Sequence, residues 1–580
     1  MAFLARLLTC CTILLISLLA ACGSTETTNA VIVQIPSEPR TLHPVEGMDA
    51  ARLQVLFYTH QTLTTLDPIK LEHMPLLARD LPVVSEDRLT YSYEIHPDAN
   101  WHDGAPITAA DVIFSIKAAM CPLLSNVAGA SQYGHINGVS LYAKNNKRFN
   151  LLMKDKYSDN RYIMDAIHIL DKRFFDPEGL LDKIPVSLIS DSAQVVATRP
   201  NMIAWAQKYG DADYGRNPVL LKGGSGPYEA VEWTPNQRIV LRRAANYWGG
   251  KEEHPVHRQY PDNIIFKAIS DENAIELQIK QQKVDVALNI PTRTFDRLAE
   301  SESGQQFYIM ESGLRDVFTY IGYNMRPDGI SHKPIFTERE VRTAFGLLTP
   351  VDALIQEYQS GRAKRIASPV YPASKFYNDT LSILPFAPDS AAKLLDAAGW
   401  VDTDGDLIRD KEINGTRIPL SIKLSLPAGQ QSFNDMMQRI VEEAAKIGFE
   451  VKLDPIDFNL LINNMTQHDF DAFFAASTSP IVGFDFSQNW TTTSWQAGTN
   501  YTGFGSPETD ILIEKLRYAH SQRSRKSLMN QIQEAIYREQ PVLFLYNSTN
   551  DIAIHRRFLN GEVLSTLPYV LLNNLQLPPQ

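Results

Sequence analysis

Hydrophobic and polar positions along this chain predict short strands that alternate with amphipathic helices. Residues 31–35 form an apolar run, and residues 89–96 alternate apolar and polar side chains as a half-buried strand does. Residues 433–447 repeat apolar positions at helical spacing, and strand-like runs lie on both sides, at 419–426 and 449–453. A strand, a helix and a second strand in this order make a right-handed unit of a parallel sheet. The pattern therefore predicts an α/β protein.

A β-hairpin is predicted within residues 223–248. Two apolar-rich runs, 228–233 and 239–243, flank the turn residues 234–237. Proline at 235 presets φ for the first central turn position and asparagine at 236 tolerates the second, so the two runs are expected to pair as antiparallel strands.

The first residues predict a targeting segment. Arg6 gives a short positive start, and the apolar run at 7–21 is too short to span a bilayer comfortably. The run ends in LAAC, with Cys22 last, and this resembles the bacterial lipobox, where signal peptidase cuts before a cysteine that carries diacylglycerol. We expect a lipidated Cys22 to hold the exported protein at a membrane surface. An uncleaved signal anchor is the alternative.

Size and composition narrow the classes of protein. A chain of 580 residues is too long for one core, since domains stop growing near about 250–300 residues, so two or three domains are expected. Hydrophobic residues make up 44% and charged residues 21%, as in ordinary globular proteins. The net charge of −11 disfavours nucleic acid as a partner. Only Cys121 follows Cys22, which excludes a disulfide framework in the mature fold.

Two longer phrases carry the strongest family signal. Residues 101–112 read WHDGAPITAADV, and residues 223–248 read GGSGPYEAVEWTPNQRIVLRRAANYW. Both strings resemble motifs of the bacterial family 5 extracellular solute-binding proteins, the peptide- and nickel-binding group that serves ABC importers. Shorter matches are TLHP at 41–44, QKVDVA at 282–287 and EVRTAF at 340–345. The resemblance extends over residues 31–575, and the chain is identified as a member of this family.

The resemblance implies an α/β fold of the periplasmic-binding-protein type II class, with two lobes, an extra subdomain like that of cluster C, and two crossing strands that form a hinge. The first crossing is expected near residues 268–271 and the return crossing at 541–546. Ligand is expected in the cleft at the strand C-termini, which closes by hinge motion. The expected segments are a signal peptide at 1–21, a lipidated tether at 22–30, lobe 1 at 31–70, 196–268 and 541–580, the extra subdomain at 71–195, and lobe 2 at 269–540.

Ligand-binding residues are also implied by the resemblance. In peptide-binding members, a loop after the strand at 470–475 carries an aspartate that pairs with the peptide α-amine. The matching residues here are Ser477, Thr478 and Ser479, without an acid, and Asp485 follows where it could substitute. Free-amine specificity therefore stays open, and peptide-like or modified-peptide solutes are included.

In peptide-binding members, the segment that matches residues 37–40 lends backbone groups to an extended ligand. Aromatic side chains are expected to stack on the ligand. The sequence is equally compatible with solvated positions for Glu38 and Arg40 and with core packing of Trp490 and Tyr501. These expected ligand contacts are Glu38, Pro39, Arg40, Asn324, Trp490 and Tyr501.

One acidic segment invites a calcium interpretation. Asp402, Asp404 and Asp406 alternate, but Gly405 precedes the third aspartate and Ile413 occupies the twelfth position, where an EF-hand has glutamate. A turn before a hairpin is the favoured interpretation, and structural calcium stays an alternative.

The sequence therefore predicts a lipid-anchored, monomeric substrate-binding protein that captures a peptide or peptide-like solute and delivers it to an ABC permease. No catalytic residue, metal or cofactor is expected, and no nucleic acid. The expected location is the cell envelope, on the periplasmic side of a membrane or on the outer face of the cell membrane. An envelope hydrolase and a sensor or chaperone-like lipoprotein on the same fold are the alternatives.

Overall fold

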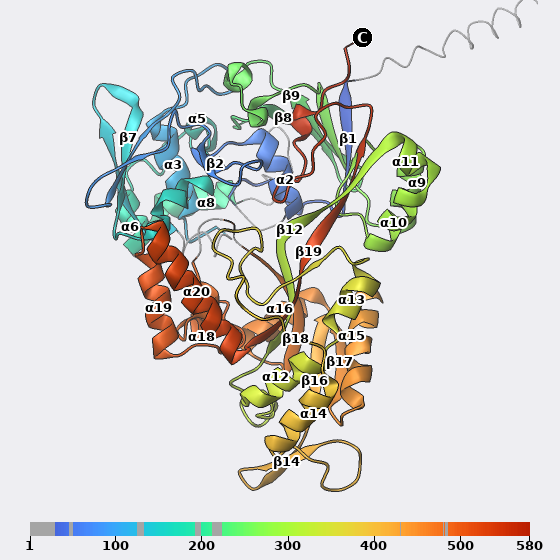
Figure 1. Ribbon diagram of the computed structural model, residues 1–580. Coiled ribbons are helices and arrows are strands. Elements are labelled where there is room, and N and C mark those ends of the chain that lie inside the picture. Colours follow the sequence, from blue (N-terminus) through green and yellow to red (C-terminus); the bar gives the residue numbers. More distant parts are fainter. Residues whose placement is uncertain are drawn as a thin grey trace, which may run out of the picture.

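The computed structural model describes residues 29–45, 50–124, 133–191, 199–210, 223–429, 431–479, 481 and 485–579 (Figure 1). Cys22 lies outside the described residues. One large mixed sheet of 11 strands runs through the molecule, with β13 (Lys364–Arg365) paired to β19 beside the main path. The main path contains, in order, β17 (Glu450–Ile456), β16 (Ser421–Pro427), β18 (Ala472–Thr478), β12 (Tyr308–Tyr323), β19 (Val542–His555), β11 (Val286–Ala287), β1 (Ala30–Ile35), β10 (Asn263–Ala268), β9 (Arg238–Arg243) and β8 (Tyr228–Thr234).

Two lobes share this sheet, and the long strands β12 and β19 pass from one to the other (Figure 1). Lobe 1 contains β8, β9, β10, β1 and β11, and its core joins Val33, Phe266 and Val286. The helices of this part are α2 (Ala50–Thr59), α9 (Glu272–Lys280), α10 (Thr292–Glu300) and α11 (Glu302–Phe307), with the short 3-10 helices η3 (Trp248–Lys251), η4 (Pro255–His257) and η5 (Leu572–Asn574).

A subdomain with its own four-stranded sheet is attached to lobe 1. Its apolar core includes Tyr93, Trp101 and Phe149, and also Trp205. A small two-stranded sheet, β2 (Thr64–Leu66) with β3 (His73–Pro75), lies next to it. The subdomain elements are β4 (Val83–Val84), β5 (Thr90–Glu94), β6 (Ile136–Tyr142), β7 (Asn145–Met153), α3 (Ala109–Ala119), α5 (Lys172–Phe175), α6 (Val186–Asp191), α8 (Pro200–Tyr209) and the 3-10 helix η1 (Ser158–Asp165).

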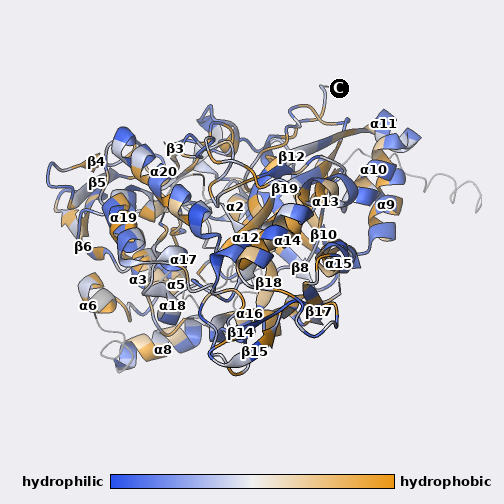
Figure 2. Ribbon diagram, turned by 60° about the horizontal axis from the view of Figure 1, so that its bottom comes forward, coloured by the Kyte–Doolittle hydropathy of each residue, from blue (hydrophilic) through white to orange (hydrophobic). Residues whose placement is uncertain are grey.

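Lobe 2 contains β16, β17 and β18 under a layer of helices. Apolar residues concentrate on the strands and on the helix faces turned toward them, while the outward helix faces are hydrophilic (Figure 2). The hairpin β14 (Asp410–Ile413) and β15 (Thr416–Pro419) projects at its far end (Figure 1). The helices are α12 (Arg339–Leu348), α13 (Val351–Tyr358), α14 (Pro388–Ala397), α15 (Gln431–Ala445), α16 (Phe458–Gln467), α17 (Ser487–Trp490), α18 (Ser494–Ala497), α19 (Pro507–Arg517) and α20 (Gln522–Glu539).

Most predicted elements are confirmed. The predicted hairpin is β8 paired with β9, and β16 and β17 are parallel neighbours joined through α15. Thr108 and Asp111 form a capping box at α3, so the family phrase at 101–112 has the structural role of a strand-to-helix turn.

The segment that follows residues 268–271, where the first crossing is predicted, packs with lobe 1. Residues 268–271 join β10 to α9, and the helices that follow pack with β1 and β11 in one apolar cluster that includes Phe295 and Tyr308. The passage to lobe 2 begins only with β12. β11 is two residues long, too short to be recognised in sequence as a strand of lobe 1. The other predicted domain limits stay predictions.

The sheet is also mixed rather than parallel. β12 runs antiparallel to both of its neighbours, β18 and β19. One strand must carry the chain into lobe 2 and another must carry it back, so the two crossing strands point in opposite directions. No helix in the described part of the chain is long and apolar enough to cross a membrane.

Candidate functional site

The crossing strands contain an irregularity where the lobes meet. β12 pairs with β19 from Tyr308 opposite His555 to Gly322 opposite Val542, but the register shifts between Leu314 and Phe318. Extra residues in one strand bend it and increase its local twist. We call this connection, β12 with β19, the strand junction.

A cavity of about 480 Å³ lies between the lobes. Lobe 1 and its subdomain contribute the turn between β2 and β3 and part of η1. Lobe 2 contributes the loop after β13, one residue that follows β18, and the beginning of α20. The lining residues are Lys70, Leu71, Glu72, His73, Arg161 and Tyr162 on the first side, and Tyr371, Ala373, Ser374, Lys375, Phe376, Ile481, His520, Gln522 and Arg525 on the second.

One edge of this cavity is closed by side chains from both lobes. Arg525 Nη2 of α20 lies 3.0 Å from Asp159 Oδ1 of η1, and both side chains are less than one tenth exposed. The Arg517 guanidinium of α19 lies 5.1 Å from the centre of the Tyr157 ring. Burial raises the pKa of Asp159, and the Arg525 charge opposes that rise. We call these four residues the side-chain junction.

Asp485 lies at the side-chain junction, outside the cavity lining. Its carboxylate accepts hydrogen bonds from the Ser487 backbone N–H at 2.8 Å and from the Tyr157 hydroxyl. Burial, followed by the charges of Asp159 and Asp485, raises the pKa of Tyr157, so its hydroxyl stays a donor at neutral pH. This predicted ligand residue is therefore engaged by protein groups in the structure.

The predicted serine and threonine residues lie at the end of β18, beside the cavity. Ser477 and Thr478 pair with β12, and Ser479 lies two residues before Ile481 of the lining. Ser479 is buried, its hydroxyl donates to Pro369 O at 2.6 Å, and its N–H donates to Asp316 O at 2.7 Å. The structure therefore brings this loop against the irregular part of β12.

Asp316 lies beside the candidate site, outside the cavity lining, and sequence reasoning missed it. It is half-buried, its carboxylate accepts a 3.4 Å hydrogen bond from Thr566, and burial raises the pKa of its carboxyl group. Tyr371, which lines the cavity, donates to Leu314 O at 3.4 Å and lies close enough for the Asp316 charge to affect it. The sequence contained one signal for Asp316: two charged residues, 315 and 316, interrupt an apolar strand pattern.

The predicted contacts at the end of β1 lie against the β8–β9 hairpin. Glu38 accepts hydrogen bonds from Trp233 Nε1 at 2.6 Å and from the Asn236 backbone at 3.1 Å. Pro39 is buried, and Arg40 is exposed. A crevice of about 10 Å³ lies beside Glu38 and Pro39, and the hydrogen bonds of Glu38 fix the turn of the hairpin.

The remaining predicted contacts are also outside the cavity lining. Asn324 is buried and donates to His468 O and Phe470 O, at 3.2 and 2.9 Å, which fastens the end of β12. Trp490 is 9% exposed and packs edge-to-face on Phe504. Tyr501 is half-buried beside the core of lobe 2. Their roles in ligand binding stay predictions.

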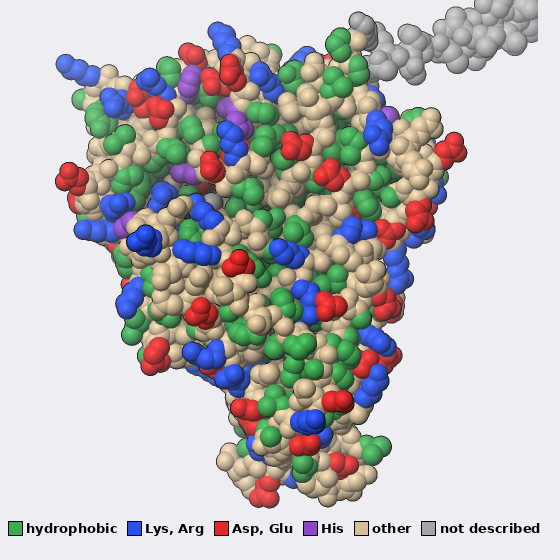
Figure 3. All heavy atoms as spheres, in the orientation of Figure 1, with side chains coloured by type: hydrophobic (Ala, Val, Ile, Leu, Met, Phe, Trp, Pro, Cys, Tyr) green, Lys and Arg blue, Asp and Glu red, His purple; other side chains and the backbone are tan. Residues whose placement is uncertain are grey.

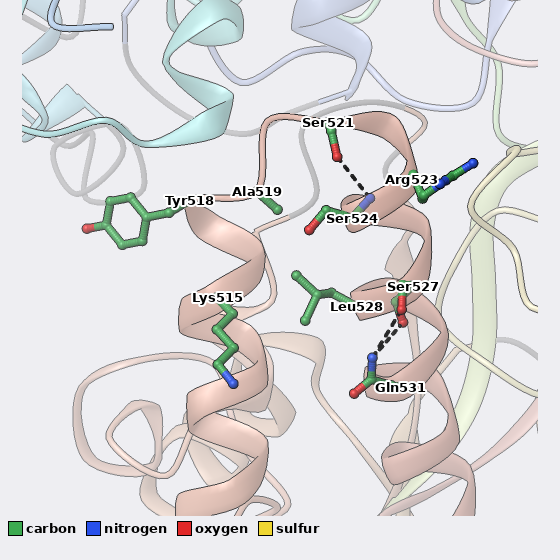
Figure 4. Close-up of a pocket in the computed structure, with 9 residues that line it drawn as sticks. All are labelled: Lys515, Tyr518, Ala519, Ser521, Arg523, Ser524, Ser527, Leu528 and Gln531. Carbon is green, nitrogen blue, oxygen red and sulfur yellow. Dashed lines mark hydrogen bonds between the residues drawn. The ribbon is translucent and has the colours of Figure 1, made fainter. Parts of the chain in front are cut away.

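A second hollow of about 530 Å³ lies between α19 and α20 (Figure 4). Leu528 points into the gap between the helices, while the Tyr518 ring, just after the end of α19, points away from it (Figure 4). Ser521 caps α20 by accepting the Ser524 N–H at 3.1 Å. One pair of helices supplies the whole lining, so movement of the lobes would not close this hollow around a solute.

The acidic segment before β14 holds an arginine. Asp402, Asp404 and Asp410 lie close together, and Arg417 Nη2 is 2.5 Å from Asp404 and 2.7 Å from Asp410. The guanidinium therefore occupies the position where a cation would balance these carboxylates.

Comparisons with known proteins agree with this architecture. The family model described as bacterial extracellular solute-binding proteins, family 5 Middle, matches residues 72–499. The oligopeptide-binding protein AppA of Bacillus subtilis is 24% identical over 533 residues, which cover 90% of this chain and 87% of AppA.

Solved structures show the same fold. AppA of B. subtilis in complex with a nonapeptide superposes with a TM-score of 0.73 at 22% identity, over 95% of this chain and 99% of that chain. NikA of Brucella suis in complex with Fe(III)-EDTA gives 0.76 at 18% identity, over 95% and 100%. The chain therefore has the predicted fold of type II periplasmic binding proteins.

Proposed function

Because this chain belongs to the bacterial extracellular solute-binding proteins of family 5, we propose that it is the substrate-binding protein of an ABC importer. It captures a peptide or peptide-like solute between its lobes and delivers it to the permease. The observation that carries this proposal is the cavity of about 480 Å³ lined from both lobes, which two long strands join. Ligands that contact both lobes favour the closed arrangement.

Asp316 is the proposed anchor for the solute's α-amine. It lies on β12, where its backbone oxygen accepts the N–H of Ser479, in the loop where the family resemblance implies an acid. A half-buried carboxylate without a cationic partner is costly, and the described residues form no ion pair with Asp316. An ammonium group would stabilise its charged form and lower its raised pKa.

Lipid anchoring at Cys22 is part of the same proposal. The short apolar run at 7–21 and the LAAC sequence support cleavage before Cys22, and acyl chains would keep the protein at the membrane beside its permease. Mass spectrometry of the membrane-bound protein should find a diacylglyceryl group on Cys22. Recovery of Cys22→Ser in the membrane fraction, equal to that of the natural protein, would contradict the anchor.

Thermal unfolding of the protein that lacks residues 1–22, screened against di- to hexapeptides, tests the proposed function. A ligand at a hundredfold its Kd stabilises the folded state by about 2.7 kcal/mol, enough for a clear rise in Tm. We expect peptides to raise the Tm and to be recovered uncleaved by mass spectrometry. Hydrolysis would favour the alternative of an envelope hydrolase, and no shift with any peptide would overturn peptide binding.

A further inference from the structure

Four histidines lie where lobe 1 meets its subdomain. His43 follows β1 and His60 follows α2 in lobe 1, while His102 precedes α3 and His168 precedes α5 in the subdomain. The His60 and His168 rings meet edge-to-face with their centres 6.2 Å apart, and all three other histidines act electrostatically on His60. On the face that Figure 3 shows, histidine side chains gather in the upper half of the molecule, away from its narrow lower end. We call these four residues the histidine joint.

Hydrogen bonds cross from one part to the other at the histidine joint. The Ile169 N–H of the subdomain donates to Gln61 O of lobe 1 at 2.8 Å. His102 Nε2 of the subdomain donates to Gly226 O, at the entry to β8, at 2.8 Å. The joint therefore helps to hold the subdomain, and with it η1, which contributes to the lining of the interlobe cavity.

The hydrogen bonds of His43 require its neutral form. Its Nε2 donates to Tyr209 O of α8 at 3.0 Å, and its Nδ1 accepts the Val45 N–H at 3.2 Å. A second proton, on Nδ1, would face that N–H and break the bond, because a charged imidazole has two donors and no acceptor.

His60 and His102 offer no partner for a second proton. His60 is 2% exposed, its Nδ1 bonds to the Thr59 hydroxyl at 2.9 Å, and its Nε2 has no hydrogen-bond partner in the described part of the chain. His102 uses Nε2 for its bond to lobe 1, and its Nδ1 is buried and without a partner among the same residues. A charged N–H in the interior without an acceptor costs free energy, so protonation opposes closure of the joint.

The charges around His60 oppose its protonation as well. Arg52 of α2 is 4% exposed, donates from Nη1 to His43 O at 2.7 Å, and acts on His60 together with the three other histidines. The segment 223–226, which contacts His60 from lobe 1, contains no titratable side chain. A proton on His60 would therefore lie among bases.

The nearby carboxylates have partners of their own. Asp103 is exposed and pairs with Arg173 at 3.0 Å, and Asp165 lies 2.8 Å from His73. The Tyr209 hydroxyl is uncharged at acid pH, as tyrosine hydroxyls are. These groups do not turn the joint into a favourable place for a positive charge.

The direction of the pH dependence follows from these contacts. Burial, followed by the charge of Arg52, lowers the pKa of His168 from 6.5 to about 4, and burial also lowers the pKa of His43 to about 4. Burial, followed by the neighbouring histidines, lowers the pKa of His60 well below its usual value. An opened joint therefore binds more protons than the closed joint between pH 6.5 and about pH 4. The closed joint is fully stable above this range and loses stability as the pH falls through it.

We propose that the histidine joint is an acid-sensitive attachment, which holds the subdomain on lobe 1 at neutral pH and releases it in acid. The strand junction contains no member of the joint, so β12 and β19 keep the two lobes connected while the subdomain loosens. The part of the cavity lining that η1 supplies is then held less firmly in acid.

Hydrogen exchange of the full-length chain at pH 7 and pH 5, followed by mass spectrometry of its peptides, tests the joint. After correction for the intrinsic rate at each pH, amides of residues 58–64 and 166–170 should exchange about tenfold or more faster at pH 5, because the opened joint gains protons. Amides of β16 in lobe 2 should keep their protection. Equal acceleration in β16 would mean that acid unfolds the whole chain, and would overturn the inference.

Variants assign the acceleration to the histidines. His60→Gln with His168→Gln leaves polar side chains that cannot titrate, so the acceleration at the same amides should fall below about threefold. His135→Gln is the matched control, because His135 lies in the subdomain, outside the joint and 2.9 Å from the Asp155 carboxylate. The control should retain the full acceleration.

Circular dichroism at pH 7 shows whether the double variant folds. If it does not, the single variant His168→Gln, at a half-buried position, carries the test and should reduce the acceleration at least about threefold. Full acceleration in the folded double variant, or in His168→Gln alone, would overturn the inference. Unchanged exchange of the natural chain between pH 7 and pH 5 would also do so, and would leave peptide capture at neutral pH intact.

Discussion

The lobes meet at two places that are built differently. At the strand junction, β12 and β19 are continuous through both lobes and stay paired despite two register shifts, between Leu314 and Phe318 and between Thr319 and Tyr320. At the side-chain junction, separate elements meet through side chains, among them Arg525, Arg517, Tyr157 and Asp159. Backbone pairing cannot separate without unfolding, whereas side-chain contacts between lobes can separate when the lobes rotate. The strand junction is therefore expected to hold, and the side-chain junction to open.

The largest expected effect is on stability, at the strand junction. Asp551 is 3% exposed, and its carboxylate bonds to Arg362 Nη2 at 2.8 Å and to Ser312 Oγ at 2.5 Å. Asp551→Ala removes a buried acceptor from Ser312 and from Arg362, which keeps Asp296 as a partner, so the free energy of unfolding in denaturant should fall by about 2 kcal/mol.

The control for this prediction is Asp352→Ala. Asp352 is 75% exposed and pairs with Arg365 at 2.9 Å, and loss of an exposed pair should change the free energy of unfolding by less than about 1 kcal/mol. Equal destabilisation by the two substitutions would contradict a special role for the buried pair.

A smaller effect, on binding, is expected at the side-chain junction. Asp159→Asn keeps the shape of the side chain but removes the charge that pairs with Arg525, so the closed arrangement loses stability relative to the open one. Peptide affinity measured by calorimetry should fall by about tenfold, which corresponds to about 1.4 kcal/mol against closure.

Glu178→Gln is the matched control for Asp159→Asn. Glu178 lies in the same subdomain and pairs with Lys208 at 3.2 Å, away from lobe 2. The control should bind peptides as the natural protein does. Unchanged affinity in Asp159→Asn would indicate that this pair stays intact in both arrangements, against the comparison drawn above.

A contact inside one lobe should respond to pH rather than to ligand. His332 Nδ1 and Nε2 each lie 2.8 Å from a carboxylate, of Asp471 and Asp469, and the Asp471 hydrogen bond chiefly raises the pKa of His332. The folded state then holds this proton more tightly than the unfolded state, whose histidine titrates near 6.5. The stabilisation is complete below that value and is lost as the pH rises through the higher folded pKa.

The variant His332→Gln tests this pH dependence. Its loss of unfolding free energy relative to the natural protein should be larger at about pH 5.5 than at about pH 9. Equal losses at both pH values would mean that the charge of His332 contributes nothing.

The smallest effect is expected from calcium. Arg417 already balances the carboxylates of Asp404 and Asp410, so calcium and a chelator should leave the Tm unchanged. A rise in Tm with calcium, reversed by the chelator, would restore the calcium interpretation of this loop.

Local patterns in the sequence predicted local structure well. The β8–β9 hairpin and the parallel pair of β16 and β17 follow from short-range signals such as turn residues and apolar periodicity. The strand β11 does not follow from such signals, because it contributes only two residues and is defined by its pairing with β1 and β19.

The site was harder to predict because it is built from residues far apart in the sequence. In the sequence, Lys70, Arg161 and Lys375 are three ordinary charged residues far from one another. Only the fold brings them to one cavity. Glu38 resembled a ligand contact by its place after β1, yet its carboxylate accepts hydrogen bonds from the hairpin. Family motifs located the loop at Ser477–Ser479, while its neighbour Asp316 emerged from strand pairing.

Closure of the lobes around a peptide is the central claim, and one distance measures it. Spin labels at Val83→Cys in the subdomain and Ile330→Cys in lobe 2, both strongly exposed, report the separation of the lobes. The protein without residues 1–22 retains only Cys121, which is buried and whose thiol pKa is raised by burial, so it should escape labelling. A saturating peptide should shorten and narrow the distance distribution from pulsed electron paramagnetic resonance. An identical distribution with and without a peptide that calorimetry shows to be bound would contradict the account.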